Sequence, residues 1–458
     1  MRRAQLGALL TLAVSLILVF VVSAFSRRGP ERCLLRRGTL TGRVDVSSSG
    51  SQADGRVYGG AISANGRYVA FGSDADNLVP SDHNHVSDVF VHDLRTGRTS
   101  RVSVSSDGVE ANGTSFRPSI SADGRYVAFR SSASNLVPGD RNGVEDIFVR
   151  DRVTGRTIRA SVGPGGAEAN GPSVASSISA NGRYVVFTSQ ASNLVPGDNN
   201  GVDDVFVRDL VAHRTFRVSV GVTREANGRS EGSSISANGH AVAFRSFAND
   251  LVPGDTNALA DDFVRNWVTG KTERVDVSSA GDQANGITFR VFLSGNGRFV
   301  AFRSRASNLV PNDTNGVLDV FEHNLLTGVT TRISIPSEGG QAVSRYLSDA
   351  PEENLFMSHP VLSFQGRYTA FGSRASNLVD HDTNRQPDVF VHDLGTGHTY
   401  RVSVSSNGEQ ANRGSYVAGI SADGRIVLFF SSATNLACGD TNGTRDLFIR
   451  RRRVTGPG

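Results

Sequence analysis

The chain has 458 residues and a formal net charge of +4, from 48 basic and 44 acidic side chains. Arginine carries nearly all of the positive charge, because Lys271 is the only lysine. Charges of both signs are mixed along the chain, and the only long basic run is the one from Arg450 to Arg453. Composition therefore gives no reason to expect a nucleic-acid partner.

Residues 1–30 are expected to direct export. Two arginines precede an uncharged, mostly apolar stretch from Leu6 to Phe25, and two more follow it. This pattern fits a signal peptide cleaved after Val22-Ser23-Ala24, and it equally fits a membrane anchor, because about 20 apolar residues can span a bilayer. We therefore expect an exported protein, periplasmic or extracellular, which this segment either leaves free or anchors in the cytoplasmic membrane.

Residues 31–39 form a linker that contains Cys33, and residues 40–456 are expected to form one domain. Similar segments recur in this domain at nearly constant spacing. The turn glycines that mark them are 58, 58, 57, 58, 69 and 58 residues apart. A fixed period of this kind indicates a repeat architecture. The turn glycines are Gly66, Gly124, Gly182, Gly239, Gly297, Gly366 and Gly424.

Each segment is expected to contain four β-strands. Short runs rich in Val, Ile, Phe and Tyr alternate with Gly, Asn, Asp and Pro, and no stretch after residue 30 keeps a helical period. The pair Asp123-Gly124 suits a two-residue hairpin turn. The run Tyr126-Val127-Ala128-Phe129 is apolar on both faces, as in a sheet packed between two others. In the second segment the expected strands are Pro118 to Ser121, Arg125 to Ser131, Asp146 to Arg152 and Thr157 to Val162.

The seventh segment ends after its third strand, at Val454-Thr455-Gly456, and a matching fourth strand occurs at the other end of the chain. Thr41 to Val46 matches the fourth strand of other segments, such as Arg101 to Val104. An N-terminal strand that completes the last sheet would close a ring and remove its open edges. The sequence therefore predicts an all-β fold, a seven-bladed β-propeller with four-stranded blades.

The motif from Ser121 to Phe129, Ser-Ala-Asp-Gly-Arg-Tyr-Val-Ala-Phe, resembles the repeats of the TolB-like, WD-repeat-like family of bacterial β-propellers. The Asp-x-x-Thr-Gly after the third strand carries the same resemblance, which covers residues 40–456. The chain differs from TolB-type propellers in having more blades. The resemblance implies the propeller fold in a cell-envelope protein. Members of the family include binding scaffolds, propeller domains of peptidases and a few polysaccharide lyases.

Ring closure would also bring the two cysteines, Cys33 and Cys438, to the same blade. In an oxidising compartment they could form a disulfide across the seam. Two free thiols are the alternative.

Every loop between the second and third strands carries the pattern Asp-x-Asn-x-x-x-Asp. Oxygen-rich loops suggest calcium, but a known calcium loop supplies ligands from more positions than the three that recur here. Asp and Asn side chains also bind their own backbone in turns, and we prefer this structural interpretation over calcium. The residues of the calcium alternative include Asp140, Asn142, Asp146, Asp198, Asn200, Asp204, Asp313, Asn315 and Asp319.

A basic residue stands one position before the end of the third strand in every segment. A ring of such groups could bind an anion, but we expect each to pair with a nearby aspartate, as Arg150 would with the adjacent Asp151. These residues are His92, Arg150, Arg208, Arg265, His323, His392 and Arg450.

A few residues break the repeat pattern. His83 and His85 are metal ligands in type, but no third ligand can be assigned. Ser230 lies in a Gly-x-Ser-x-Gly pattern away from any strand-to-helix elbow, and we interpret the match as accidental. Trp267, the only tryptophan, is expected to pack against other residues rather than to bind a sugar.

The two faces of the disc are expected to differ in charge. The repeated aspartates lie on the face of the long loops, and arginines gather on the face of the tight turns, which would therefore meet an acidic surface such as an anionic lipid layer. The expected basic residues of the tight-turn face are Arg67, Arg125, Arg183, Arg298, Arg367, Arg425, Arg98, Arg156 and Lys271.

The leading functional hypothesis is a non-catalytic, exported propeller that binds an envelope or extracellular protein or glycan. Its site should lie on the long-loop face or in the axial channel, and no catalytic residue, cofactor or metal site is assigned. The alternative is a polysaccharide lyase or hydrolase with its active site in the channel. This alternative would gain support if His240, or His359 in the expanded loop between Ala342 and Pro360, faced clustered acids across the channel.

Overall fold

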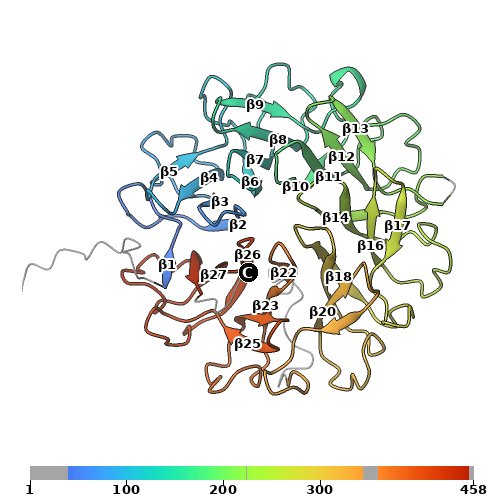
Figure 1. The fold of residues 1–458 in the computed structure, drawn as a ribbon. Coiled ribbons are helices and arrows are strands. Elements are labelled where there is room, and N and C mark those ends of the chain that lie inside the picture. The colour runs from blue at the N-terminus through green and yellow to red at the C-terminus, as the bar shows by residue number, and fades with distance from the viewer. Residues whose placement is uncertain (1–39, 223, 344–358, 453–458) are drawn as a thin grey trace, which may run out of the picture.

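The computed structural model describes residues 40–222, 224–343 and 359–452. In these ranges the strands form seven four-stranded sheets around a central axis, so the chain is an all-β, seven-bladed propeller (Figure 1). The predicted export segment and the linker lie outside the described residues. Within the described ranges, no helix has the length and apolar character needed to cross a bilayer.

Within a blade, consecutive strands pair antiparallel, from the first strand near the axis to the fourth at the rim (Figure 1). Blades 1 to 3 consist of β2 (Val57–Ile62), β3 (Tyr68–Ser73), β4 (Asp88–Asp93), β5 (Thr99–Arg101), β6 (Ser115–Ile120), β7 (Tyr126–Ser131), β8 (Asp146–Asp151), β9 (Arg156–Arg159), β10 (Ser173–Ile178), β11 (Tyr184–Ser189), β12 (Asp204–Asp209) and β13 (Arg214–Arg217). Blades 4 to 6 consist of β14 (Ser230–Ile235), β15 (Ala241–Ser246), β16 (Asp261–Asn266), β17 (Lys271–Arg274), β18 (Thr288–Leu293), β19 (Phe299–Ser304), β20 (Asp319–Asn324), β21 (Thr330–Arg332), β22 (Val361–Leu362), β23 (Tyr368–Ser373), β24 (Asp388–Asp393) and β25 (His398–Arg401). A short 3-10 turn, Pro164–Gly166, lies between blades 2 and 3.

Blade 7 closes the ring with strands from both ends of the chain. It consists of β26 (Ser415–Ile420), β27 (Ile426–Ser431), β28 (Asp446–Arg451) and β1 (Thr41–Arg43), and β1 pairs with β28. The buried Arg43 side chain lies 3.1 Å from Asp446 and 3.4 Å from Asp440. The predicted closure is confirmed. A disulfide between Cys438 and Cys33 stays a prediction, because Cys33 lies outside the described residues.

The core lies between the blades. One phenylalanine from the second strand and one from the third pair within each blade, as Phe129 and Phe148 do with ring centroids 6.0 Å apart. Each blade then packs on the next, so that Phe71 of blade 1 shares a buried cluster with Leu428 and Leu447 of blade 7. Sheets covered on both faces explain why the central residues of the second and third strands are apolar on both faces.

The basic residues near the end of each third strand contact a threonine of the fourth strand in the same blade, and the predicted pairing with aspartates is wrong. Arg150 Nη1 donates to Thr157 Oγ1 (2.9 Å) and to the carbonyl of Ser105 (2.8 Å) in the preceding blade. Successive side chains of a strand point to opposite faces, so Arg150 and Asp151 cannot meet. The equivalent threonine contact is made by His92, Arg208, Arg265, His323, His392 and Arg450.

The aspartates at the ends of the third strands pair instead with arginines of the tight turns. Arg125 Nη2 lies 2.7 Å from Asp151 Oδ2, and its hydrogen bonds hold the pKa of Asp151 well below the usual range. Similar pairs join Arg67 to Asp93, Arg183 to Asp209 and Arg367 to Asp393. The tight-turn face is therefore less basic than the sequence suggested, since much of its arginine charge is already paired.

The first strand starts earlier and the fourth ends earlier than predicted. In blade 2, β6 begins at Ser115 rather than at Pro118. Its pairing with β7 shifts register between Phe116 and Ser119, and Ser115 and Phe116 still pair with β7 before this shift. Proline inside a strand indicates such an irregularity, since it cannot donate to the ladder. The fourth strand, β9, ends at Arg159, before the expected end at Val162.

Candidate ligand site in the axial channel

In the long loops, the repeated aspartates surround an arginine from the end of the fourth strand. In blade 2, Arg159 Nη1 lies 3.0 Å from Asp140 Oδ1, 3.2 Å from Asp146 Oδ2 and 2.8 Å from Glu168 Oε1. Asn142 donates to Asp146 Oδ2 (2.9 Å) and accepts from a backbone N–H two residues on, as in an Asx-turn. A guanidinium group thus already occupies the space between these carboxylates and offsets part of their charge.

The same arrangement recurs around the ring. Asn200 and Asn315 donate to Asp204 and Asp319, and Asp198 and Asp313 contact the local arginine. Calcium at these loops stays a prediction, and it would have to compete with the guanidinium groups. These are Arg43, Arg101, Arg159, Arg217, Arg274, Arg332 and Arg401.

Two histidines of the first long loop turn to different carboxylates. His83 Nδ1 lies 3.4 Å from Glu110, whereas His85 Nδ1 lies 2.8 Å from Asp76. The two imidazoles therefore do not converge. Within the described ranges, no group of three His, Cys, Asp or Glu side chains is arranged to hold a metal ion.

Ser230 and Trp267 have structural contacts. The Ser230 hydroxyl is buried at the start of β14, 2.9 Å from that of Ser246, a pairing that ties the first two strands of blade 4 together. Trp267 Nε1 donates to the carbonyl of Gly239 (2.7 Å), and its ring lies 5.0 Å from that of Phe216. Both contacts agree with the interpretations from sequence.

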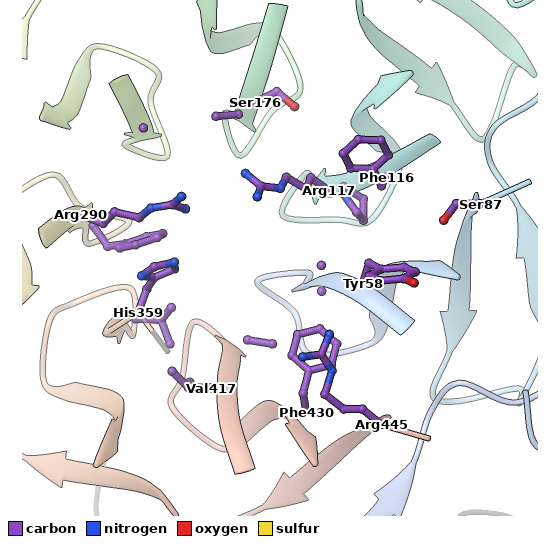
Figure 2. Close-up of a pocket in the computed structure, with 18 of the residues that line it drawn as sticks. Tyr58, Ser87, Phe116, Arg117, Ser176, Arg290, His359, Val417, Phe430 and Arg445 are labelled. Atoms are coloured by element: carbon purple, nitrogen blue, oxygen red, sulfur yellow. The ribbon is translucent and has the colours of Figure 1, made fainter. Parts of the chain in front are cut away.

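A cavity of about 610 Å³ lies on the axis of the ring (Figure 2). All seven first strands, β2, β6, β10, β14, β18, β22 and β26, contribute to its wall. Asp74 and Ser87, which flank the long loop of blade 1, also line it. The cavity therefore lies toward the long-loop side of the channel, where sequence reasoning placed function.

One position of the first strand has a left-handed backbone in five blades. Gly59, Arg117, Ala175, Gly232 and Arg290 have φ values of 56°, 52°, 52°, 58° and 41°. This conformation suits glycine, but it costs a residue with a Cβ atom roughly 1–2 kcal/mol. Strained residues of this kind cluster at functional sites, so the two arginines identify the cavity as a candidate site.

Arg117 and Arg290 reach into the cavity from opposite sides, with their guanidinium groups directed toward one another (Figure 2). Loss of solvation lowers the pKa of both side chains, and repulsion by Arg117 adds to the shift at Arg290. Both groups nevertheless stay protonated, because guanidinium groups do not lose their proton in proteins. Two poorly solvated positive charges face a common space, which favours an anion between them.

Aromatic rings form much of the remaining wall. His359 stacks on Phe292 with ring centroids 5.5 Å apart, and the Arg445 guanidinium lies 5.0 Å from the centroid of Phe430. The Tyr58 hydroxyl donates to Asp74 Oδ2 (2.7 Å). The cavity thus offers flat apolar surfaces beside cationic groups, which suits a ring-shaped ligand that carries a carboxylate.

The histidines named in the enzyme hypothesis have different positions. His359 lines the cavity on the same side as Arg290, and Asp74 is the only acid among the described lining residues (Figure 2). His240 does not line the cavity and lies near Tyr184, with ring centroids 6.2 Å apart. In the part of the chain that the structure describes, neither histidine faces clustered acids across the channel.

Sequence reasoning did not identify Arg117 and Arg290, although the signal was present. When the first strands are aligned by the repeat, these arginines stand where the other blades have Gly59, Ala175, Gly232, His359 and Val417. A long charged side chain in a position that three blades fill with glycine or alanine marks a departure from the repeat.

No family model and no curated protein matches the sequence. The structure is similar to TolB from Acinetobacter baumannii, at 15% identity and a TM-score of 0.39, over 75% of this chain; the match spans 62% of the TolB chain. It is also similar to an oligogalacturonate lyase in complex with manganese, at 13% identity and a TM-score of 0.53, over 90% of this chain and 92% of that one. The oligogalacturonate lyase from Vibrio parahaemolyticus gives 13% identity and a TM-score of 0.50 over 90% and 93%. The likeness to the two lyase structures shows a shared fold.

Proposed function

We propose that this propeller is an exported, non-catalytic protein that binds acidic oligosaccharides of the cell envelope or its surroundings. The ligand lies in the axial cavity and places a carboxylate between Arg117 and Arg290. The observation that carries the proposal is the pair of arginines, which adopt a strained backbone and face one another across the cavity.

The residues that line the axial cavity are the reason for proposing a saccharide ligand. Guanidinium groups bind carboxylates through two parallel hydrogen bonds, and aromatic rings such as Phe116 and Phe292 offer flat apolar surfaces to the faces of sugar rings. The cavity of about 610 Å³ has room for a small ligand. Oligogalacturonate lyases act, by name, on an acidic oligosaccharide, so the fold likeness suggests oligogalacturonate as the first probe.

Calorimetric titration of the purified protein with tri-galacturonate tests the proposal. We expect binding that weakens as salt is raised and that is lost when the uronate carboxylates are methyl-esterified, because esterification removes the charge and keeps the sugar ring. Equal binding of acid and ester would contradict a carboxylate contact.

Arg117→Gly is the most informative variant. Gly59 and Gly232 already occupy the same position with the same sign of φ, so the change removes a charge and relieves backbone strain. We expect affinity for tri-galacturonate to fall roughly 10- to 100-fold, the usual range for a hydrogen bond to a charged group. The melting temperature should stay the same or rise.

Arg141→Gln is the matched control, because Arg141 is exposed on a long loop and does not line the cavity. It should leave affinity unchanged. Wild-type affinity in Arg117→Gly would place the ligand elsewhere.

One observation favours the alternative of a lyase. His359 lies in the same cavity as Arg290, and elimination from a uronate requires a base near the proton beside a carboxylate whose charge cations have neutralised. Incubation with tri-galacturonate, followed by the ultraviolet absorbance of an unsaturated product, distinguishes the two functions. We expect no product. If product forms in the wild type and is lost in His359→Gln, the protein is an enzyme.

A further inference from the structure

The turns between third and fourth strands carry exposed apolar residues in four consecutive blades. Val153, Val211, Val268 and Leu326 stand at equivalent positions and are 73%, 68%, 56% and 71% exposed. We call this arc of four side chains, on the tight-turn face, the apolar rim. Contiguous exposed apolar surface marks an interaction site, whereas isolated residues need no explanation; here the side chains recur at one position of successive blades on one face.

Exposed cations accompany the apolar rim. Arg156, Arg214 and Lys271 follow Val153, Val211 and Val268 by three residues, and all three begin a fourth strand with an exposed side chain. Arg98 has the same place in blade 1. Unlike the arginines of the tight turns that pair with aspartates, Arg98 and Arg156 have no ion pair among the described residues. The rim therefore combines apolar side chains with cationic charge.

The chain enters the propeller from this same face. The carbonyl of Leu40 accepts from Arg451 N–H (2.7 Å), and Thr41 pairs with Arg450 at the end of a third strand. The apolar stretch from Leu6 to Phe25 is separated from this point by residues 26–39, which reach about 50 Å at most when fully extended. If that stretch is held in a bilayer, the tight-turn face is the one closest to its surface.

We infer that the tight-turn face docks on an anionic lipid surface. The apolar rim enters the boundary between headgroups and acyl chains, and Arg98, Arg156 and Arg214 contact the anionic headgroups. Apolar burial and attraction to anionic lipid together hold peripheral proteins at membranes, and each cation near the surface contributes to the attraction. In this orientation the axial cavity, on the long-loop side, faces away from the membrane.

The single tryptophan reports on this docking without labelling. Trp267 is adjacent to Val268 in the apolar rim and is partly exposed. The full-length chain is reconstituted in nanodiscs of phosphatidylcholine with phosphatidylglycerol, in which the acyl chains are brominated. We expect the bromine atoms to quench Trp267 fluorescence, and we expect quenching to decrease in pure phosphatidylcholine or at high salt.

Two sets of variants separate docking of the tight-turn face from any anchoring by the N-terminal segment, because all of them keep that segment. Val153→Ser, Val211→Ser and Leu326→Ser, combined, should lose most of the quenching, and Arg98→Gln, Arg156→Gln and Arg214→Gln should weaken docking roughly fivefold per cation. Val109→Ser with Val222→Ser is the control, because these exposed residues are at the opposite, long-loop end of the fourth strands. This control should quench like the wild type.

The inference is overturned if wild-type Trp267 is not quenched, or if the rim variants are quenched as strongly as the wild type. It is also overturned if the apolar rim joins two copies of the chain. Sedimentation would then show that the wild type dimerises in zwitterionic nanodiscs and that the rim variants do not. Because the cavity variant Arg117→Gly and its control Arg141→Gln should both dock normally, failure here is distinguishable from failure of saccharide binding.

Discussion

Deletion of residues 40–47 should abolish the folded monomer. The deletion removes β1 and leaves β28 as an open sheet edge. It also removes Arg43, so that Asp440 and Asp446 lose their guanidinium partner, a loss that costs roughly 3–5 kcal/mol where both partners are buried. That amount approaches the whole stability of many domains, and the exposed edge favours aggregation. Sedimentation velocity and thermal unfolding measure the outcome.

A chain without residues 1–38 is the matched control, because it loses a longer segment and keeps β1. It should sediment as a monomer with a normal unfolding transition. A deletion of 40–47 that stays monomeric and melts at the wild-type temperature would refute closure by β1.

Glu322→Gln should make the protein more stable at alkaline pH. Glu322 is 3% exposed in β20, where other blades have an apolar residue such as Val91 or Val149. The Thr369 hydroxyl donates to Glu322 Oε2 (2.7 Å) from the next blade. Burial raises the pKa of Glu322 to about 8, from an ordinary value of 4.5, although this hydrogen bond opposes the shift.

The raised pKa fixes the sign of the pH effect. Between pH 4.5 and pH 8 the folded state holds a proton that the unfolded state has lost, so the free energy of unfolding falls as pH rises through this window. Each unit of pKa shift corresponds to about 1.36 kcal/mol, so the loss in the free energy of unfolding amounts to as much as roughly 5 kcal/mol. Glutamine keeps the shape of the protonated acid without ionising. The variant should therefore match the wild type near pH 4.5 and exceed it above pH 8.

Denaturant unfolding at several pH values measures this difference between the variant and the wild type. Other buried acids, such as Asp262 with a pKa raised to about 7 by burial, make stability fall in the same direction in both proteins and cancel in the comparison. Glu409→Gln, at an exposed loop position, should change nothing. Parallel pH profiles for Glu322→Gln and the wild type would show that Glu322 does not govern the alkaline loss.

The fold was predictable because each blade repeats the same sequence pattern. Turn glycines at constant spacing and strands that are apolar on both faces predicted the number of blades, and Thr41 to Val46 predicted how the ring closes. The strand ends were less predictable, because the bulge before Pro118 interrupts the alternation on which strand assignment depends. The aspartate pairing at Arg150 failed for a related reason: adjacency in sequence places two side chains on opposite faces of a strand.

The candidate site was harder to predict, since a channel lined by seven strands joins residues that are far apart in the chain. Arg117 and Arg290 face one another across the cavity although 173 positions separate them in the chain. Their position in the repeat could be read from sequence, but the left-handed backbone that turns them into the cavity could not. Glu322 and Thr369 likewise become partners only when blades 5 and 6 pack together.

Five blades share the left-handed backbone conformation at one position of the first strand, and this affects how such a protein can evolve. The residues are Gly59, Arg117, Ala175, Gly232 and Arg290. Glycine, alanine and arginine already occupy equivalent places within one chain, so the sheets tolerate different side chains there without rearrangement. A single codon change in one blade can add or remove a charge in the channel while the remaining blades keep the ring intact. New ligand preferences are therefore accessible by small mutational steps, each of which preserves a folded protein.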